Sequence, residues 1–240
     1  MPSRRIPCIF EVIIYLDHTY GIYPNYLGPM PLHPPSIKGK NVGMSHQMNN
    51  PNEIDPFAGR IVVGMDGSDG SLKAANWAVG EAKLRGRGIT LTHAVIPMAA
   101  SSAFGVAVPP RLDLIEDMHN SALEDLTRLA ADLDCPDIDV VVEIGTPAAL
   151  LLAASDTAEL LVLGSRGRGG FTSLLLGSVG SQVASHANCP VIVVRDNPRA
   201  GATEILVGID GSRNSIAALG FAFDEASRHG FSLVAIHAWD

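Results

Sequence analysis

The chain has 240 residues and a formal net charge of −8, and apolar residues make up 47% of it. This length allows one to two domains, and the apolar content is sufficient for a packed core. The acidic balance argues against general binding to nucleic acids or to anionic membranes, because both need a basic surface.

Residues 1–59 differ in composition from the rest of the chain and are rich in Pro, Asn, Tyr and Met. Because prolines interrupt helices and central strands, we predict an irregular and largely disordered leader with one short strand at residues 8–16. One hypothesis is that Met44 or Met48 is the natural start of translation, which would make the residues before it a non-native extension.

Two features bear on the cellular compartment. Arg4 and Arg5 precede an apolar run at residues 6–16, but this run is shorter than the roughly 20 residues that span a bilayer, and no small-residue cleavage site follows it. The three cysteines are far apart and form no C-x-x-C pair, so we expect no disulfide framework and no zinc site. We therefore expect a cytoplasmic protein that does not associate with membranes.

From Arg60 onward, short apolar runs alternate with segments of helical periodicity. The first helix ends at Gly86, the second covers Leu112–Leu133, and Pro147 stands in the first turn of the third. We read residues 97–110 as a long loop. The predicted strands are residues 61–65, 89–96, 139–144, 160–163 and 191–194, and the fourth predicted helix is residues 178–187.

The alternation of apolar strands with helices is typical of an α/β fold in which helices cover both faces of a parallel sheet. We therefore predict one complete domain at residues 60–196. In such sheets, ligands bind beyond the carboxyl ends of the strands, where the strand order reverses.

The beginning of this domain is repeated near the end of the chain. Residues 205–212 repeat the pattern of residues 61–68, and Asp210 stands 144 positions after Asp66. The match continues without a gap to His93 and His237. We therefore predict a partial second repeat at residues 204–240 that contains strand, helix and strand. Such a unit leaves sheet edges and one sheet face uncovered, so it either adds onto the first domain or a partner, or belongs to a longer gene product.

A glycine-rich loop carries the clearest chemical signal. The strand at 160–163 runs into Gly164 and Gly167, and the loop ends at Gly177-Ser178, where a helix begins. Glycines allow close approach to a ligand, and a helix start offers free N–H groups and a positive dipole end, so the arrangement is typical of an anion site. The loop departs from the Walker A pattern, because Gly170-Phe171 stands where Lys-Ser/Thr is required.

With two residues between its first glycines and nine before Gly177-Ser178, this loop resembles the ATP-binding signature of the universal stress protein family. The stretches at 63–68, 91–95 and 186–194 also resemble that family in its bacterial tandem form, here with a truncated second domain. The resemblance implies a Rossmann-like fold, similar to adenine nucleotide α-hydrolases, with a five-stranded parallel sheet of order 3-2-1-4-5. It also implies bound ATP, with Mg²⁺ as a possible companion.

Carried over by position, the resemblance assigns three parts of a nucleotide site. Adenine and ribose would lie against the end of the first strand and against Ala94, the ribose and phosphates would approach the loop glycines, and the helix start would bind the phosphates. The residues so assigned are Gly64, Met65, Asp66, Ala94, Gly164, Gly167, Gly177, Ser178 and Val179. We assign no catalytic residue and no metal ligand.

Our leading interpretation is an ATP-binding stress-response regulator with little or no turnover, because no lysine, general base or carboxylate cluster accompanies the loop. One alternative is a slow ATP hydrolase or adenylating enzyme in which Asp66 holds a metal, and another is a dimerisation scaffold without nucleotide. The resemblance further implies a homodimer or self-association through the fifth strand and the partial repeat. We expect no nucleic-acid partner.

Overall fold

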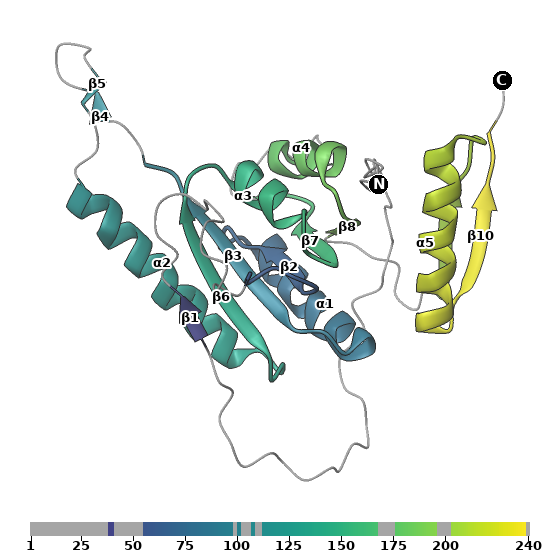
Figure 1. Cartoon of the computed structure of the whole chain (residues 1–240), viewed down its shortest axis with the longest axis horizontal. Helices are drawn as coiled ribbons and strands as arrows, with labels where there is room; N and C mark the ends of the chain where they lie inside the picture. The colour runs from purple at the N-terminus through teal and green to yellow at the C-terminus, as the bar shows by residue number, and fades with distance from the viewer. Residues whose placement is uncertain are drawn as a thin grey trace, which may run out of the picture.

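The computed structural model describes residues 38–40, 55–97, 100–101, 107–108, 112–167, 176–195 and 203–238. The centre of the structure is a parallel sheet in the strand order β1-β6-β3-β2-β7-β8 (Figure 1). The five core strands are β2 (Ile61–Gly64), β3 (Ile89–Val95), β6 (Ile138–Ile144), β7 (Leu160–Gly164) and β8 (Val191–Val194). They follow the predicted order 3-2-1-4-5, so the predicted fold class is confirmed.

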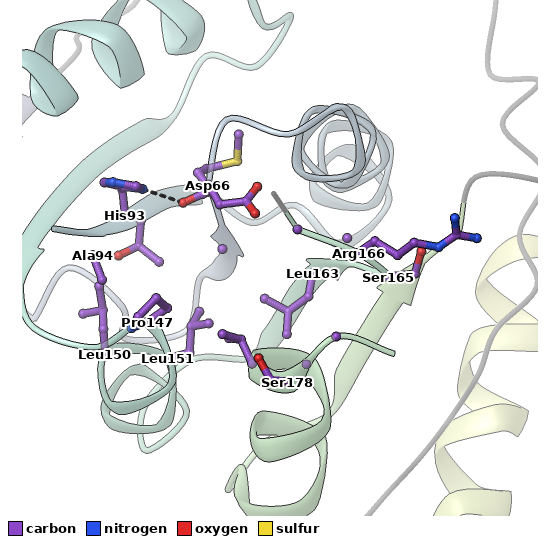
Figure 2. A pocket seen from close by; sticks show the side chains of 18 residues that line it. Asp66, His93, Ala94, Pro147, Leu150, Leu151, Leu163, Ser165, Arg166 and Ser178 are labelled. Carbon is purple, nitrogen blue, oxygen red and sulfur yellow. Dashed lines mark hydrogen bonds between the residues drawn. The ribbon is translucent and has the colours of Figure 1, made fainter. Parts of the chain in front are cut away.

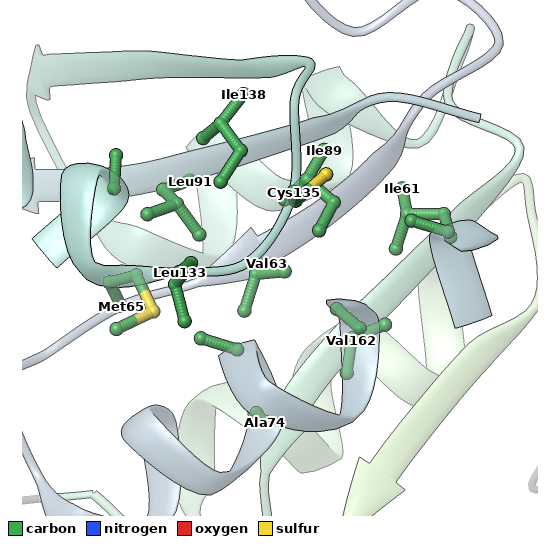
Figure 3. Close-up of a cluster of buried hydrophobic side chains, with 14 of the residues drawn as sticks. Ile61, Val63, Met65, Ala74, Ile89, Leu91, Leu133, Cys135, Ile138 and Val162 are labelled. Carbon is green, nitrogen blue, oxygen red and sulfur yellow. The ribbon is translucent and has the colours of Figure 1, made fainter. Parts of the chain in front are cut away.

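Helices cover both faces of this sheet. On one face, α1 (Asp69–Arg85) and α2 (Leu112–Asp132) enclose a core that includes Ile61, Val63 and Leu91, all fully buried (Figure 3). On the other face, α3 (Pro147–Ala154) and α4 (Ser178–His186) cover the opposite side chains of the same strands. Strands buried on both faces are therefore apolar throughout, which is the pattern that the sequence shows.

The predicted helix boundaries are close to those in the structure, because local capping fixes them. The Ser68 hydroxyl accepts a hydrogen bond from the Ser71 N–H at the start of α1, and Gly86 ends the helix with φ 63°. A left-handed residue after the last turn is a common helix end, and glycine adopts it without a Cβ penalty. Thr146 caps α3 in the same way as Ser68, with Pro147 in the first turn.

Three observations correct the prediction in and around the loops. Residues 97–110 were predicted as a loop, but Ala100–Ser101 (β4) and Ala107–Val108 (β5) pair as a short antiparallel ladder. Within the predicted irregular leader, Lys38–Lys40 (β1) pairs with β6. Phe57, also in that leader, is 3% exposed and packs in the core under α3 and α4, so the packed domain begins before residue 60. The predicted strand at residues 8–16 lies outside the described residues.

The end of the chain forms a strand, a helix and a second strand. β9 (Glu204–Gly208) and β10 (Ser232–Ile236) form a separate two-stranded parallel sheet, and α5 (Arg213–His229) packs on one of its faces (Figure 1). Leu206, Val234 and Ile236 on the other face are 48%, 38% and 50% exposed. No helix among the described residues is long and apolar enough to cross a membrane.

Candidate functional site

A cavity of about 480 Å³ lies at the carboxyl ends of β2, β3 and β7 (Figure 2). The strand order reverses at β2: the chain first continues to β3 and β6 on one side of β2, and later to β7 and β8 on its other side. This is the position at which parallel α/β sheets bind ligands. All nine predicted site residues line the cavity: Gly64, Met65, Asp66, Ala94, Gly164, Gly167, Gly177, Ser178 and Val179.

One wall of the cavity is apolar. Pro147, Leu150 and Leu151 from α3 and Leu163 from β7 face the space beside Ala94 (Figure 2). We had not assigned these four residues to the site from the sequence. Their spacing in the sequence is equally typical of residues that pack in the core, so no local signal distinguishes a core residue from one that lines the cavity.

The start of α4 lies next to this apolar wall and also lines the cavity (Figure 2). Gly177 is the N-cap of this helix and makes no side-chain capping hydrogen bond, whereas Ser68, Thr146 and Ser212 cap α1, α3 and α5. An uncapped helix start leaves N–H groups that need acceptors and carries the positive end of the helix dipole. Ser178 lines the cavity at this point and can add a hydroxyl donor.

Asp66 connects the end of β2 to the glycine loop. Its Oδ1 accepts hydrogen bonds from the N–H of Ser68 at 3.0 Å and from the Ser68 hydroxyl at 2.6 Å. Its Oδ2 lies so close to Gly167 that a Cβ at position 167 would collide with it. Gly167 therefore makes room for this carboxylate, in addition to any room that it leaves for a ligand.

Gly164 lies where the packing of α1 on β7 leaves no room for a side chain. A Cβ at this position would lie 2.6 Å from the carbonyl carbon of Gly70 and 3.0 Å from the backbone nitrogen of Ser71. The first turn of α1 thus packs directly on the end of β7, backbone against backbone. This contact brings Asp66, the start of α1 and the glycine loop together at one edge of the cavity.

Among the other polar residues that line the cavity, His93 and Arg166 have different surroundings. His93 Nδ1 lies 2.7 Å from the carbonyl oxygen of Met65, and His237 Nδ1 lies 2.6 Å from that of Ile209 in the repeat. Since the same contact occurs at His237, where no such cavity is described, we attribute it to the strand geometry. The Arg166 side chain is exposed and extends away from Asp66, Ala94 and Ser178 (Figure 2).

A family model, related sequences and a solved structure all relate this chain to the same group of proteins. The family model described as "Universal stress protein family" matches residues 58–195. A universal stress protein of Mycolicibacterium smegmatis is 37% identical over 186 residues, and one of Mycobacterium tuberculosis is 39% identical over 188 residues. Each alignment covers 75% of this chain, and the chain spans 63% of the length of each relative.

A solved structure supports the fold. The crystal structure of a universal stress protein from Archaeoglobus fulgidus superposes with a TM-score of 0.55 at 22% identity. The superposition covers 75% of this chain and 66% of that chain.

Proposed function

We propose that this chain, which belongs to the universal stress protein family, binds an adenine nucleotide in the cavity beside β2 and β7 and acts as a stress-response regulator with little or no turnover. ATP is the proposed nucleotide, and Mg²⁺ would accompany its phosphates. The observation that carries the proposal is the mixed lining of the cavity. It combines an apolar wall from α3 with the uncapped start of α4, and a nucleotide likewise combines an apolar base with an anionic group.

The proposed pose follows from this division. The base would lie against Ala94, Leu150 and Leu151, because burial of its faces needs apolar neighbours. The phosphates would accept hydrogen bonds from the N–H groups and the hydroxyl at the start of α4, near Ser178. Gly64, Met65, Gly164 and the remaining predicted residues would line the space between these ends.

Low turnover is proposed because the cavity lacks the usual catalytic partners. Among the described residues that line it, Asp66 is the only carboxylate, and no lysine is present. Phosphoryl transfer usually needs positioned cations and a group that orients the nucleophile. Asp66, which already accepts two hydrogen bonds from Ser68, is the residue through which Mg²⁺ would be held, and steady-state ATPase assays of the wild type and Asp66→Ala test for an enzyme.

Two further parts of the proposal concern the setting of the protein. We propose self-association through β8, which pairs with β7 alone within the described part of the chain and is therefore a sheet edge. Light scattering after size-exclusion chromatography tests this part. We also propose a cytoplasmic location, which suits the buried thiol of Cys135, a cysteine that forms no disulfide.

Calorimetric titration of the full chain with ATP and Mg²⁺ tests the binding proposal. We expect one nucleotide per chain and not two, because the repeat lacks a glycine loop. Ser178→Ala should weaken binding about tenfold to hundredfold, since a hydrogen bond to a charged group is worth about 1.5–3 kcal/mol.

A pair of glycine variants provides a matched control. In Gly64→Ala the new Cβ would lie 2.5 Å from Leu163 Cδ2 and 3.3 Å from Leu151 Cδ1, so it should crowd the cavity and weaken binding. Gly208, its equivalent in the repeat, has no heavy atom within 4 Å of such a Cβ, so Gly208→Ala should leave the affinity unchanged. Absence of binding by the wild type, or two bound equivalents, would contradict the proposal.

A further inference from the structure

A second cluster of chemically active side chains lies between α1 and α5. Glu81 and Arg85 from α1 meet Glu225 and His229 from α5, and these side chains are 1%, 6%, 1% and 4% exposed. Arg85 forms ion pairs with Oε1 of Glu81 and with Oε1 of Glu225. Charged groups this deeply buried need a partner for every polar atom, because a buried charge without a partner strongly destabilises the folded protein.

The cluster joins equivalent positions of the two repeats. Glu225 stands 144 residues after Glu81, and His229 stands 144 residues after Arg85. Arg85 bridges the Oε1 atoms of the two carboxylates, and His229 faces their Oε2 atoms. Because His229 is the equivalent of Arg85, a fully symmetric pair of helices would have a second arginine at this position. The two repeats thus differ at the position that matters most for the chemistry of the cluster.

The Oε2 side is incompletely satisfied. His229 Nε2 lies 3.0 Å from Oε2 of Glu81 and 3.7 Å from Oε2 of Glu225. Oε2 of Glu225 is buried and has no hydrogen-bond partner among the described residues. The two carboxylate oxygens and the imidazole nitrogen all lie within 4.8 Å of one another.

We propose that Glu81, Glu225 and His229 form a zinc site that links α1 to α5. Tetrahedral ligands at about 2.0–2.1 Å from Zn²⁺ lie about 3.3–3.4 Å apart, so the distances of 3.0 and 3.7 Å from His229 Nε2 require only small shifts, and the two carboxylate oxygens lie within 4.8 Å of each other. An imidazole with two carboxylates suits Zn²⁺ better than Mg²⁺ or Ca²⁺, which prefer oxygen ligands alone.

The surroundings of the two carboxylates fit this role. Arg85 and Arg228 contact Oε1 of Glu225, and Arg85 also contacts Oε1 of Glu81, which fixes both carboxylates with Oε2 directed to the site. Glu159 adds a third carboxylate, 3.2 Å from Arg85, and offsets part of the arginine charge.

The proposed site is independent of the nucleotide cavity and would act as a clamp between the two repeats. The sequence predicts no zinc site, since the three ligands share no local spacing. Glu81 and His229 are separated by 148 positions and come together through the packing of the helices.

The test is the titration of the purified, chelator-treated full chain with ZnCl₂, and with CoCl₂ as a spectroscopic probe. The informative variant is His229→Arg, which places on α5 the residue that α1 has at the equivalent position. It retains a cation for both glutamates and removes the metal ligand, so the fold should persist. His186→Gln, at an exposed helix end where His186 contacts the Gln182 carbonyl, is the control for adventitious histidine binding.

We expect one Zn²⁺ per wild-type chain, with the same affinity in His186→Gln and at least about tenfold weaker binding in His229→Arg, since even outer-shell changes cost about tenfold to hundredfold. The Co²⁺ spectrum should indicate nitrogen and oxygen ligands without a thiolate charge-transfer band. No zinc binding by the wild type, or equal binding by His229→Arg, would overturn the proposal and leave a protonated His229 between two carboxylates.

Discussion

The substitution Gly164→Ala tests whether the glycine loop is placed by direct backbone contact with α1. The new Cβ would lie 2.6 Å from the carbonyl carbon of Gly70, 2.8 Å from its oxygen and 3.0 Å from the nitrogen of Ser71. Carbon atoms are in favourable contact at about 3.5–4.0 Å, so the start of α1 and the end of β7 would have to separate by about 1 Å. Backbone atoms cannot rotate away as the end of a side chain can.

The expected cost follows from this separation. Overpacking of a tightly packed site usually destabilises a protein by about 1–3 kcal/mol. Urea denaturation, followed by circular dichroism, should show this loss as a lower midpoint at constant slope. ATP affinity should fall as well, because the same contact holds Asp66 and Ser68 at the edge of the cavity.

Gly80→Ala, in the middle of α1, is the matched control. A Cβ at Gly80 meets no heavy atom within 4 Å, so the change should stabilise the protein by about 0.5–1 kcal/mol through helix propensity. If Gly164→Ala were as stable as the wild type, the backbone contact between β7 and α1 would not exist as described.

Two other predictions concern buried polar groups. Thr90→Val should cost about 1–3 kcal/mol, because its hydroxyl donates to the Pro56 carbonyl at 2.6 Å, whereas Thr92→Val should be neutral or slightly stabilising, because the buried Thr92 hydroxyl has no hydrogen-bond partner among the described residues; urea midpoints decide both. The neighbouring carboxylates of Glu225 and Glu81 raise the pKa of His229 from 6.5 to about 9, so its contribution to stability is complete below pH 6.5 and is lost as the pH rises through 9. In metal-free buffer, the wild type should therefore lose more stability than His229→Arg between pH 7 and pH 10, and parallel curves for the two proteins would refute this.

The fold was predictable because local signals and the global arrangement agree. The apolar strands and the helix end at Gly86 lie within a residue or two of their predicted places, and the sheet order followed from the family resemblance. The site residues were likewise brought together as expected, since the carboxyl ends of parallel strands share one edge of the sheet.

What the sequence did not predict depends on contacts between distant segments. The pairing of Lys38–Lys40 with β6 involves a segment that composition alone describes as irregular. The apolar wall at Leu150 and Leu151 has the same periodicity as any core helix. The cluster of Glu81 and His229 exists because two repeats pack against each other, which no local spacing encodes.

The most direct test of the central claim is the nucleotide content of the protein itself. The purified full chain is denatured, and the supernatant is analysed by nucleotide chromatography, with the melting temperature of a nucleotide-free sample recorded before and after addition of ATP and Mg²⁺. We predict adenine nucleotide close to one equivalent per chain, or a clear rise in melting temperature on adding ATP, with both reduced in Gly64→Ala and unchanged in Gly208→Ala. A wild-type protein that contains no adenine nucleotide and melts at the same temperature with and without ATP would contradict the account.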